Sequence, residues 1–212
     1  MENTPSTSDI YETLKKRIIC LEYAPGQVLN EKDIANEFNL SRTPVRRVFE
    51  QLKIRKLLNI IPRFGAQVAP IDFLYIKSVL DVSRELEGFA AGLAAERISE
   101  AKIEELEAIV NRIGKYDIVK DYKQIIIEDQ RFHAIVYESS GNPCLIEILD
   151  DLHMHTERMW LYVQPDINDI NLFMGTLPNI INALKARDAG KASEYAKLHT
   201  DQFVEQIKQE LL

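Results

Sequence analysis

Residues 23–56 carry a pattern of helix breaks and caps that few folds accommodate. Apolar side chains recur at near-helical spacing from Ile10 to Leu21, and Tyr23-Ala24-Pro25-Gly26 ends this first helix. Asn30 is a typical N-cap residue and precedes a short apolar-patterned segment, residues 31–38. The sequence therefore predicts two helices separated by a sharp bend.

A third helix follows the tight turn Asn39-Leu40. Ser41 or Thr43 is its expected N-cap, and Pro44 stands in its first turn, where a missing N–H costs little. Its buried stripe is expected to consist of Val45, Val48, Phe49 and Leu52. Basic side chains lie mostly off this stripe, so the same helix is expected to present a cationic outer face.

Two short β-like runs come next, Leu58–Ile61 and Ala66–Ala69, with Pro62-Arg63-Phe64-Gly65 as the hairpin turn between them. The order helix, helix, turn, helix, hairpin is typical of a winged helix-turn-helix. We predict such a domain over residues 1–70, with residues 1–7 as a frayed tail and residues 70–72 as a short linker.

Residues 71–212 show helical periodicity throughout and no convincing strands. The whole chain is therefore predicted to be mainly α, with a C-terminal antiparallel bundle of about six helices over residues 71–212. Breaks at Ser99, Gly114 and Gly141-Asn142-Pro143 are among those that separate the helices. The expected helical segments are 73–96, 99–114, 119–139, 143–163, 172–187 and 190–211.

Charge divides the chain at the same place. Residues 1–70 contain 11 Lys and Arg and 8 Asp and Glu, a net charge of +3, whereas residues 71–212 contain 15 and 25, a net charge of −10. Six of the basic residues lie between Ser41 and Lys56, with Glu50 as the one acid there. The first part is thus suited to approach phosphates, which would repel the second.

Arginine at the exposed N-terminal part of a recognition helix matches both guanine edges and phosphate oxygens. Hydroxyl groups and free N–H groups at a helix start hold phosphates, and a wing tip reaches a minor groove. The predicted DNA-contacting residues are Lys32, Ser41, Arg42, Thr43, Arg46, Arg47, Arg63 and Gly65. The alternative interpretation is a solvated basic helix in an ordinary domain.

The second part has one pattern that suggests a metal. Asp129 and His133 are four residues apart in one predicted helix, so both point to one face, and a carboxylate and an imidazole at this spacing can share a divalent cation. His199 is expected to face the bundle interior, because Ala192, Ala196 and Phe203 share its face. A hydrogen-bonded core histidine and a local Asp–His contact are the alternatives.

Other features exclude some classes of protein. No apolar run approaches the roughly 20 residues of a membrane span. The N-terminus lacks the pattern of a signal peptide, and Cys20 and Cys144 match no metal or redox spacing. We therefore expect a cytoplasmic protein with reduced cysteines and no membrane partner.

Residues 10–68 resemble the GntR family of bacterial winged-helix transcription regulators, through PGQVLNEKDIANEFNLSRTPVRRVFEQL. The resemblance implies DNA contacts from Lys32, Ser41, Arg42, Thr43, Arg46 and Gly65. Arg47 departs from the pattern, since the family usually has Glu there, and it adds positive charge.

Residues 73–205 resemble the FCD effector domain of the FadR-like branch, through SRELEGFAAGLAAER, DQRFHAIVYESSGNP and ALKARDAGKASEYAKLH. Many such domains bind Zn or a similar ion with one Asp and three His. Asp129, His133 and His199 match three of these positions, and Leu177 stands at the remaining one. Two hypotheses follow: Zn, Ni or Mn binds with water or an effector carboxylate in the shell, or the site is weak or empty.

The resemblance also suggests that Arg84 grips an effector carboxylate, with a pair to Glu87 or a surface charge as the alternative. His153 and His155 are interpreted as ordinary polar or lining residues. The predicted function is a homodimeric regulator, not an enzyme, that binds double-stranded operator DNA and a small organic acid. A metal-dependent hydrolase and an architectural DNA-binding protein are the alternatives.

Overall fold

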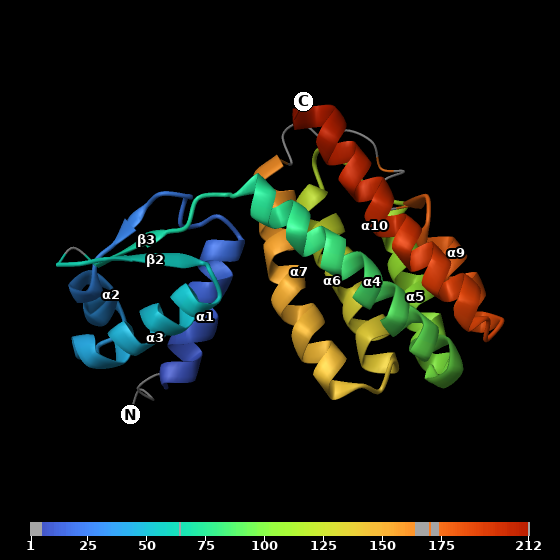
Figure 1. Ribbon diagram of the computed structural model, residues 1–212, viewed down its shortest axis with the longest axis horizontal. Coiled ribbons are helices and arrows are strands. Elements are labelled where there is room, and N and C mark those ends of the chain that lie inside the picture. The colour runs from blue at the N-terminus through green and yellow to red at the C-terminus, as the bar shows by residue number, and fades with distance from the viewer. Residues whose placement is uncertain (1–5, 64, 164–169, 171–173, 212) are drawn as a thin grey trace. The chain divides into compact units, whose positions relative to one another are not determined.

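The computed structural model describes residues 6–63, 65–163, 170 and 174–211 and divides the chain into two compact units, Met1–Asp72 and Phe73–Leu212. Figure 1 shows a mixed unit of helices and a small sheet, followed by a unit built from helices.

The N-terminal unit has the predicted helices and hairpin in the predicted order, together with one short strand, β1, that was not predicted. Its helices are α1 (Thr7–Ile19), α2 (Glu31–Glu37) and α3 (Arg42–Ile54), and its strands are β1 (Val28–Leu29), β2 (Leu58–Ile61) and β3 (Gly65–Val68). The strands form an antiparallel sheet in the order β1-β3-β2. Leu58 pairs with Val68 and Ile61 with Gly65, so β2 and β3 form the expected wing. Phe64, in the predicted hairpin turn, lies outside the described residues.

The start of α1 corrects the prediction of a frayed tail over residues 1–7 at its last two residues, whereas residues 1–5 lie outside the described residues. Ser6 accepts the N–H of Asp9 at 3.2 Å, and the Asp9 carboxylate accepts the N–H of Ser6 at 2.8 Å. This capping box satisfies two backbone donors, so the helix begins at Thr7. Asn30 caps α2 as expected, because its side chain accepts the N–H of Lys32 at 2.8 Å.

The core of this unit lies between α1, α3 and the sheet. Ile10, Leu14 and Ile18 of α1 are fully buried, as are the side chains of the predicted α3 stripe. The basic residues of α3 are left on the outside. Burial of the apolar face thus fixes which way the cationic face points.

The C-terminal unit is an all-helical bundle in its described residues, as predicted. Phe73–Arg97 is α4, whose small side chains Ala90, Ala91, Ala94 and Ala95 are buried. Helix α4 packs along α10 and also contacts α6, α7 and α9. The remaining helices are α5 (Glu100–Ile113), α6 (Tyr122–Ser139), α7 (Pro143–Val163), α9 (Leu177–Lys185) and α10 (Ala189–Leu211).

Two boundaries of the C-terminal helices differ from the predicted ones by more than two residues. Helix α6 starts at Tyr122 rather than 119, because the Asp117 carboxylate accepts the N–H groups of Val119 and Lys120, both at 3.0 Å, and holds a turn. Helix α9 starts at Leu177, whereas the predicted segment began at 172, and residues 172 and 173 lie outside the described residues. Among the described residues, no helix is long and apolar enough to cross a membrane.

Gly65 is where the wing tolerates no side chain. Its φ is +122°, and an added Cβ would lie 2.4 Å from the carbonyl oxygen of Leu29. Gly26 also has a positive φ, +84°, but an added Cβ there meets nothing within 4 Å. A side chain at Gly26 would meet backbone strain alone, whereas a side chain at Gly65 would also collide with the carbonyl oxygen of Leu29.

We expect Gly65→Ala to destabilise the wing by about 2–4 kcal/mol, because strain and overpacking add, and Gly26→Ala by about 1 kcal/mol through strain alone. Amide hydrogen exchange of β2 and β3 in the full chain measures both changes. Equal loss of protection in the two variants would show that the contact with Leu29 is unimportant.

Candidate functional site

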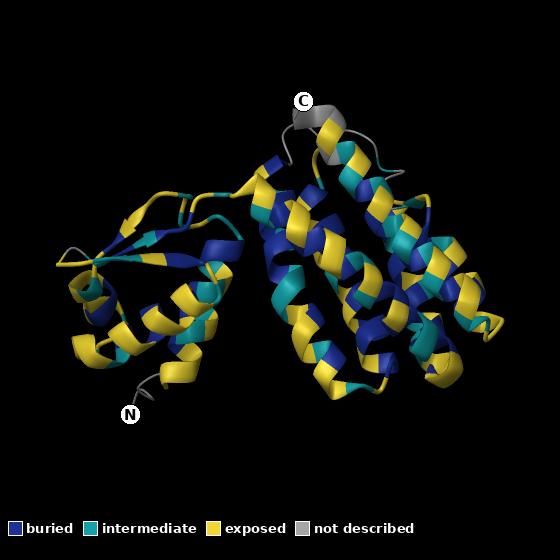
Figure 2. Ribbon diagram, viewed as in Figure 1, coloured by how far each residue is buried: buried dark blue, intermediate teal, exposed yellow. Residues whose placement is uncertain are grey.

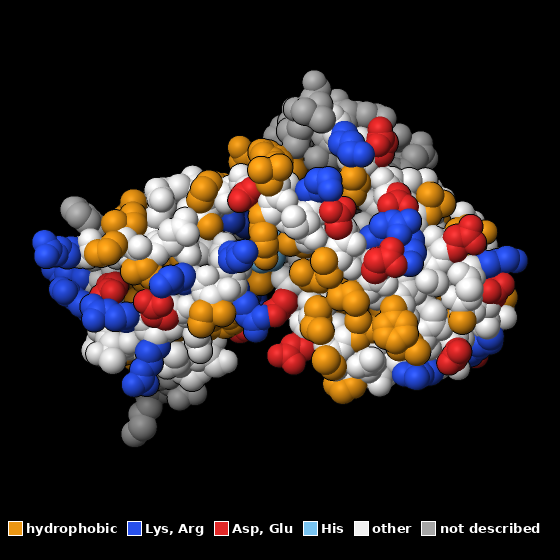
Figure 3. Space-filling view, viewed as in Figure 1, with side chains coloured by type: hydrophobic (Ala, Val, Ile, Leu, Met, Phe, Trp, Pro, Cys, Tyr) orange, Lys and Arg blue, Asp and Glu red, His pale blue; other side chains and the backbone are white. Residues whose placement is uncertain are grey.

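A basic groove lies on the N-terminal unit, where the starts of α2 and α3 meet the wing. Its volume is ≈ 310 Å³. Figure 3 shows Lys and Arg side chains gathered at this end of the unit. Asn30, Glu31 and the wing residues Ile60, Ile61 and Pro62 are among its lining residues. Of the predicted DNA-contacting residues, the groove brings together Lys32, Arg42, Arg46, Arg63 and Gly65.

Arg46 is held in this groove by a residue that sequence reasoning did not single out. Its Nε donates to Glu31 Oε1 at 3.0 Å and its Nη2 to Glu31 Oε2 at 2.8 Å. The bond from Arg46 lowers the pKa of Glu31. Because the Arg46 side chain is 68% exposed, solvent screens the pair, and releasing it costs little. A base or phosphate contact, worth about 1–3 kcal/mol, can replace it.

The other predicted contacts lie around the start of α3. Ser41 occupies the N-cap position by its backbone, but its side chain makes no capping hydrogen bond. Ser41, Thr43 and Arg47 are all exposed. The hydroxyl groups and the N-terminal N–H groups of α3 are therefore accessible to an anion. DNA contact by each of these residues stays a prediction.

A second cluster is buried in the C-terminal unit. Asp129 and His133 come from α6 and His199 from α10, and one ligand atom from each lies within 4.8 Å of the other two. His133 Nε2 is 3.8 Å from Asp129 Oδ2, and His199 Nε2 is 3.9 Å from Asp129 Oδ1. These separations are too long for hydrogen bonds but allow one ion to lie between the groups.

Hydroxyl groups lie next to the Nδ1 atoms of His133 and His199. Thr176 Oγ1 lies 2.7 Å from His199 Nδ1, and Tyr137 Oη lies 3.4 Å from His133 Nδ1. The Tyr137 hydroxyl donates its one proton to Glu87 Oε1, at 2.8 Å. Its oxygen can therefore only accept a hydrogen bond from His133 Nδ1. With Nδ1 as the donor in His133, and with the Thr176 hydroxyl able to accept from His199 in the same way, each Nε2 lone pair would face Asp129, which is the arrangement of metal-ligating histidines.

Burial sets the charge of these groups. It lowers the pKa of His133 to about 4 and that of His199 to about 3, so both imidazoles are neutral at pH 7. Burial and the nearby Glu87 raise the pKa of Asp129 to about 8. Within the described part of the chain, Asp129 Oδ1 is a buried oxygen with no hydrogen-bond partner. A divalent cation would satisfy that oxygen, so the residues present fit a metal.

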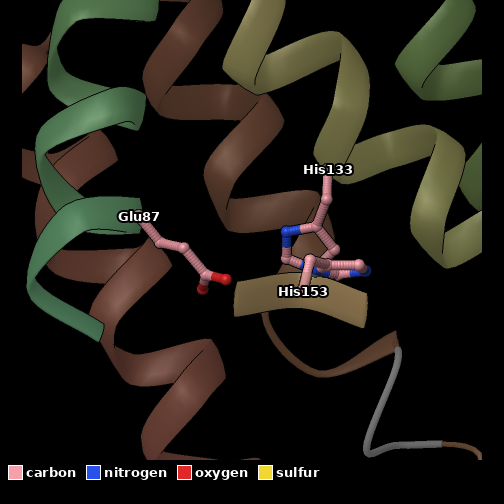
Figure 4. A group of neighbouring side chains, drawn as sticks. All are labelled: Glu87, His133 and His153. Atoms are coloured by element: carbon pink, nitrogen blue, oxygen red, sulfur yellow. The ribbon is translucent and has the colours of Figure 1, made fainter. Parts of the chain in front are cut away.

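His153 also belongs to this cluster, and sequence reasoning did not place it there. Its ring centroid is 5.0 Å from that of His133, whereas the centroid of His199 is 5.4 Å from it. Figure 4 shows His153 beside His133, with the Glu87 carboxylate pointing toward them. The structure thus places His153 next to His133, and the interpretation of His153 as an ordinary polar or lining residue stays a prediction. His155 instead packs its ring edge-on against Tyr75, with centroids 5.3 Å apart.

The structure also shows the surroundings of Leu177 and Arg84. Leu177 is fully buried at the first turn of α9, next to Thr176, and offers no ligand atom. Arg84 donates from Nε and Nη2 to Asp201 of α10, at 2.6 and 3.0 Å, and also pairs with Glu85. The cavity beside the histidines is not lined by Arg84, and its effector role stays a prediction.

That cavity is small. It is bordered by Glu87, His133, Tyr137 and His199 together with apolar side chains, and its volume is ≈ 10 Å³. This space is about that of a single water molecule or ion. An organic acid would enter only if the bundle opened.

Comparison with known proteins gives two matches along the chain. Residues 78–202 match the FCD domain, and residues 6–68 match the bacterial regulatory proteins of the gntR family. The HTH-type transcriptional repressor RspR of Escherichia coli K12 is 24% identical over 208 residues, which cover 97% of this chain and 90% of RspR. The galactonate operon transcriptional repressor of the same strain is 28% identical over 162 residues, covering 67% and 70%.

A solved structure agrees in fold. That of E. coli McbR/YncC superposes with a TM-score of 0.82 at 23% identity and covers 100% of both chains. The mainly helical architecture and the small sheet of the N-terminal unit are thereby confirmed. With a basic winged helix-turn-helix followed by a matching helical bundle, the chain belongs to the GntR family of bacterial transcription regulators and carries an FCD domain.

Proposed function

We propose that this DNA-binding regulator acts in the cytoplasm as a homodimer whose operator affinity is set by a small organic acid, sensed at a divalent cation in the FCD domain. The observation that carries the proposal is the convergence of Asp129, His133 and His199 on one buried point with an unpaired carboxylate oxygen. Zn, Ni and Mn are the candidate cations, because imidazole and carboxylate suit all three.

The nature of the effector follows from this chemistry. The cation, when bound, supplies coordination positions that a carboxylate can take. The apolar lining around Glu87, His133 and His199 suits a small molecule with one charged end. The name of the galactonate operon repressor, a relative, supports a sugar acid or a similar carboxylate.

The DNA-binding step uses the basic groove. Arg42 and Arg46 of α3 are proposed to contact bases and phosphates in the major groove, with Lys32 and the α3 N-terminus on the backbone and Arg63 in the minor groove. Two copies related by a two-fold axis would read a near-palindrome, with half-sites about one helical turn apart or somewhat closer. An effector that prefers one arrangement of the dimer shifts affinity by about 1–3 kcal/mol.

The alternative functions are not favoured. The matched relatives and structures are transcription regulators rather than enzymes, so Asp129, His133 and His199 are not assigned to a hydrolase. An architectural protein without an effector would not account for the match of residues 78–202 to an FCD domain.

Arg46→Ala should weaken binding to a duplex that the full chain selects from a random library about tenfold or more, because one charge-assisted contact is lost. Arg131→Ala is the matched control, since Arg131 is also an exposed arginine paired with a glutamate, but lies on α6. A gel-shift titration at fixed salt measures both. Equal affinity of the Arg46 variant and the unchanged chain would remove Arg46 from the interface.

Protein purified without chelators should contain Zn, Ni or Mn by elemental analysis, and chelation should lower its melting temperature, because an ion that binds the folded state stabilises it. Asp129→Asn should lose most of this metal. Asp81→Asn, which changes an exposed α4 carboxylate paired with Lys77, should keep it. Metal-free preparations that also show no thermal shift with added ions would contradict the metal site.

A further inference from the structure

The three ligands of the proposed cation leave its shell incomplete. A tetrahedral site with protein ligands alone takes four, and Asp129, His133 and His199 supply three. Leu177 of α9 adds none. The structure places other donors beside His133.

Glu87 of α4 and His153 of α7 are those donors. Together with His133 they offer ligand atoms that all lie within 4.8 Å of one another, the same closeness as in the first set. His133 is common to both sets, and the His153 ring lies nearer to it than the His199 ring does. A cation bound to His133 therefore has His153 among its nearest further donors.

Tyr137 holds these groups in position. Its hydroxyl donates to Glu87 Oε1 and lies 3.4 Å from His133 Nδ1 and 3.5 Å from His153 Nδ1. Since the single proton of Tyr137 goes to Glu87, both Nδ1 atoms face it as donors, and both Nε2 lone pairs stay available.

The charge of the cluster points the same way. Glu87 accepts at both oxygens, from Tyr137 and from Thr200 Oγ1, each at 2.8 Å, as a carboxylate does. Asp129 and Glu87 bring two carboxyl groups into the interior, where they are 5% and 9% exposed. A divalent cation that binds there and displaces the proton of Asp129 balances two carboxylates.

We propose that His153 is a ligand of the cation at His133, recruited from α7 where α9 supplies no donor, and that Glu87 is the second anion that balances the charge of the ion. This inference rests on the proposed metal site and specifies its composition. The ion then joins α6, α7 and α10 directly, so its loss or gain bears on how α7 packs in the bundle.

The test uses the full chain, stripped of metal by a chelator and titrated with Co²⁺, whose visible absorption reports the number and kind of ligands. His153→Leu should weaken Co²⁺ binding about tenfold or more and alter the absorption spectrum. His155→Leu is the control, because it removes another largely buried histidine from the same helix. Its Co²⁺ affinity and spectrum should equal those of the unchanged chain.

His153→Cys gives a direct readout of ligation. A thiolate bound to Co²⁺ adds a charge-transfer band in the near ultraviolet that a residue acting through a neighbour does not produce. The unchanged chain, with Cys20 and Cys144, provides the baseline. Appearance of the band supports ligation even if His153→Leu is poorly folded.

The outcomes separate the two proposals. If the unchanged chain binds no Co²⁺, the metal part of the proposed function fails, and this inference with it. If the chain binds Co²⁺ and Asp129→Asn does not, while both His153 variants bind as tightly as the unchanged chain and no charge-transfer band appears, the metal site stands and His153 is not a ligand.

Discussion

The FCD domain buries two acidic side chains in its helical bundle, and each needs partners that stabilise it there. Asp129 and Glu87 are 5% and 9% exposed, and the histidines around them are neutral. Hydroxyl groups of Tyr137 and Thr200 satisfy Glu87, whereas Asp129 keeps one oxygen without a partner among the described residues. Burial raises the pKa of Asp129 to about 8, because its charged form is costly without a counter-charge. The cluster therefore suits a cation, and the proposed ion would join α6, α7 and α10.

The N-terminal unit carries its positive charge on the surface. Burial of the apolar face of α3 leaves Arg42, Arg46 and Arg47 exposed on the opposite face of the helix. The pair between Arg46 and Glu31 then fixes one guanidinium in the groove at little energetic cost. The acidic remainder of the chain, with a net charge of −10, has no comparable attraction to DNA.

Local signals in the sequence predicted most of the fold. Caps, breaks and apolar spacing gave the helices of both units and the wing, because these features act within a few residues. Strand β1 was missed, since a strand of two residues has no detectable period, and the Ser6–Asp9 capping box was overlooked. Asp129 and His133 could be paired because they share one helix face. Glu87 and His153 could not, since their approach depends on how α4 and α7 pack against α6. The pairing of Glu31 with Arg46 could not be predicted either, because the two residues are fifteen positions apart and meet only when α2 packs against α3.

The central claim is that the cation site and the DNA-binding surface are energetically coupled. The most direct measurement is the operator affinity of the full chain with and without bound metal, at one salt concentration, together with the metal affinity with and without operator. Linkage requires the two ratios to be equal, and we predict a change of at least about fivefold in both. Identical operator affinities for the metal-loaded and metal-stripped protein, with the ion demonstrably bound, would contradict the account.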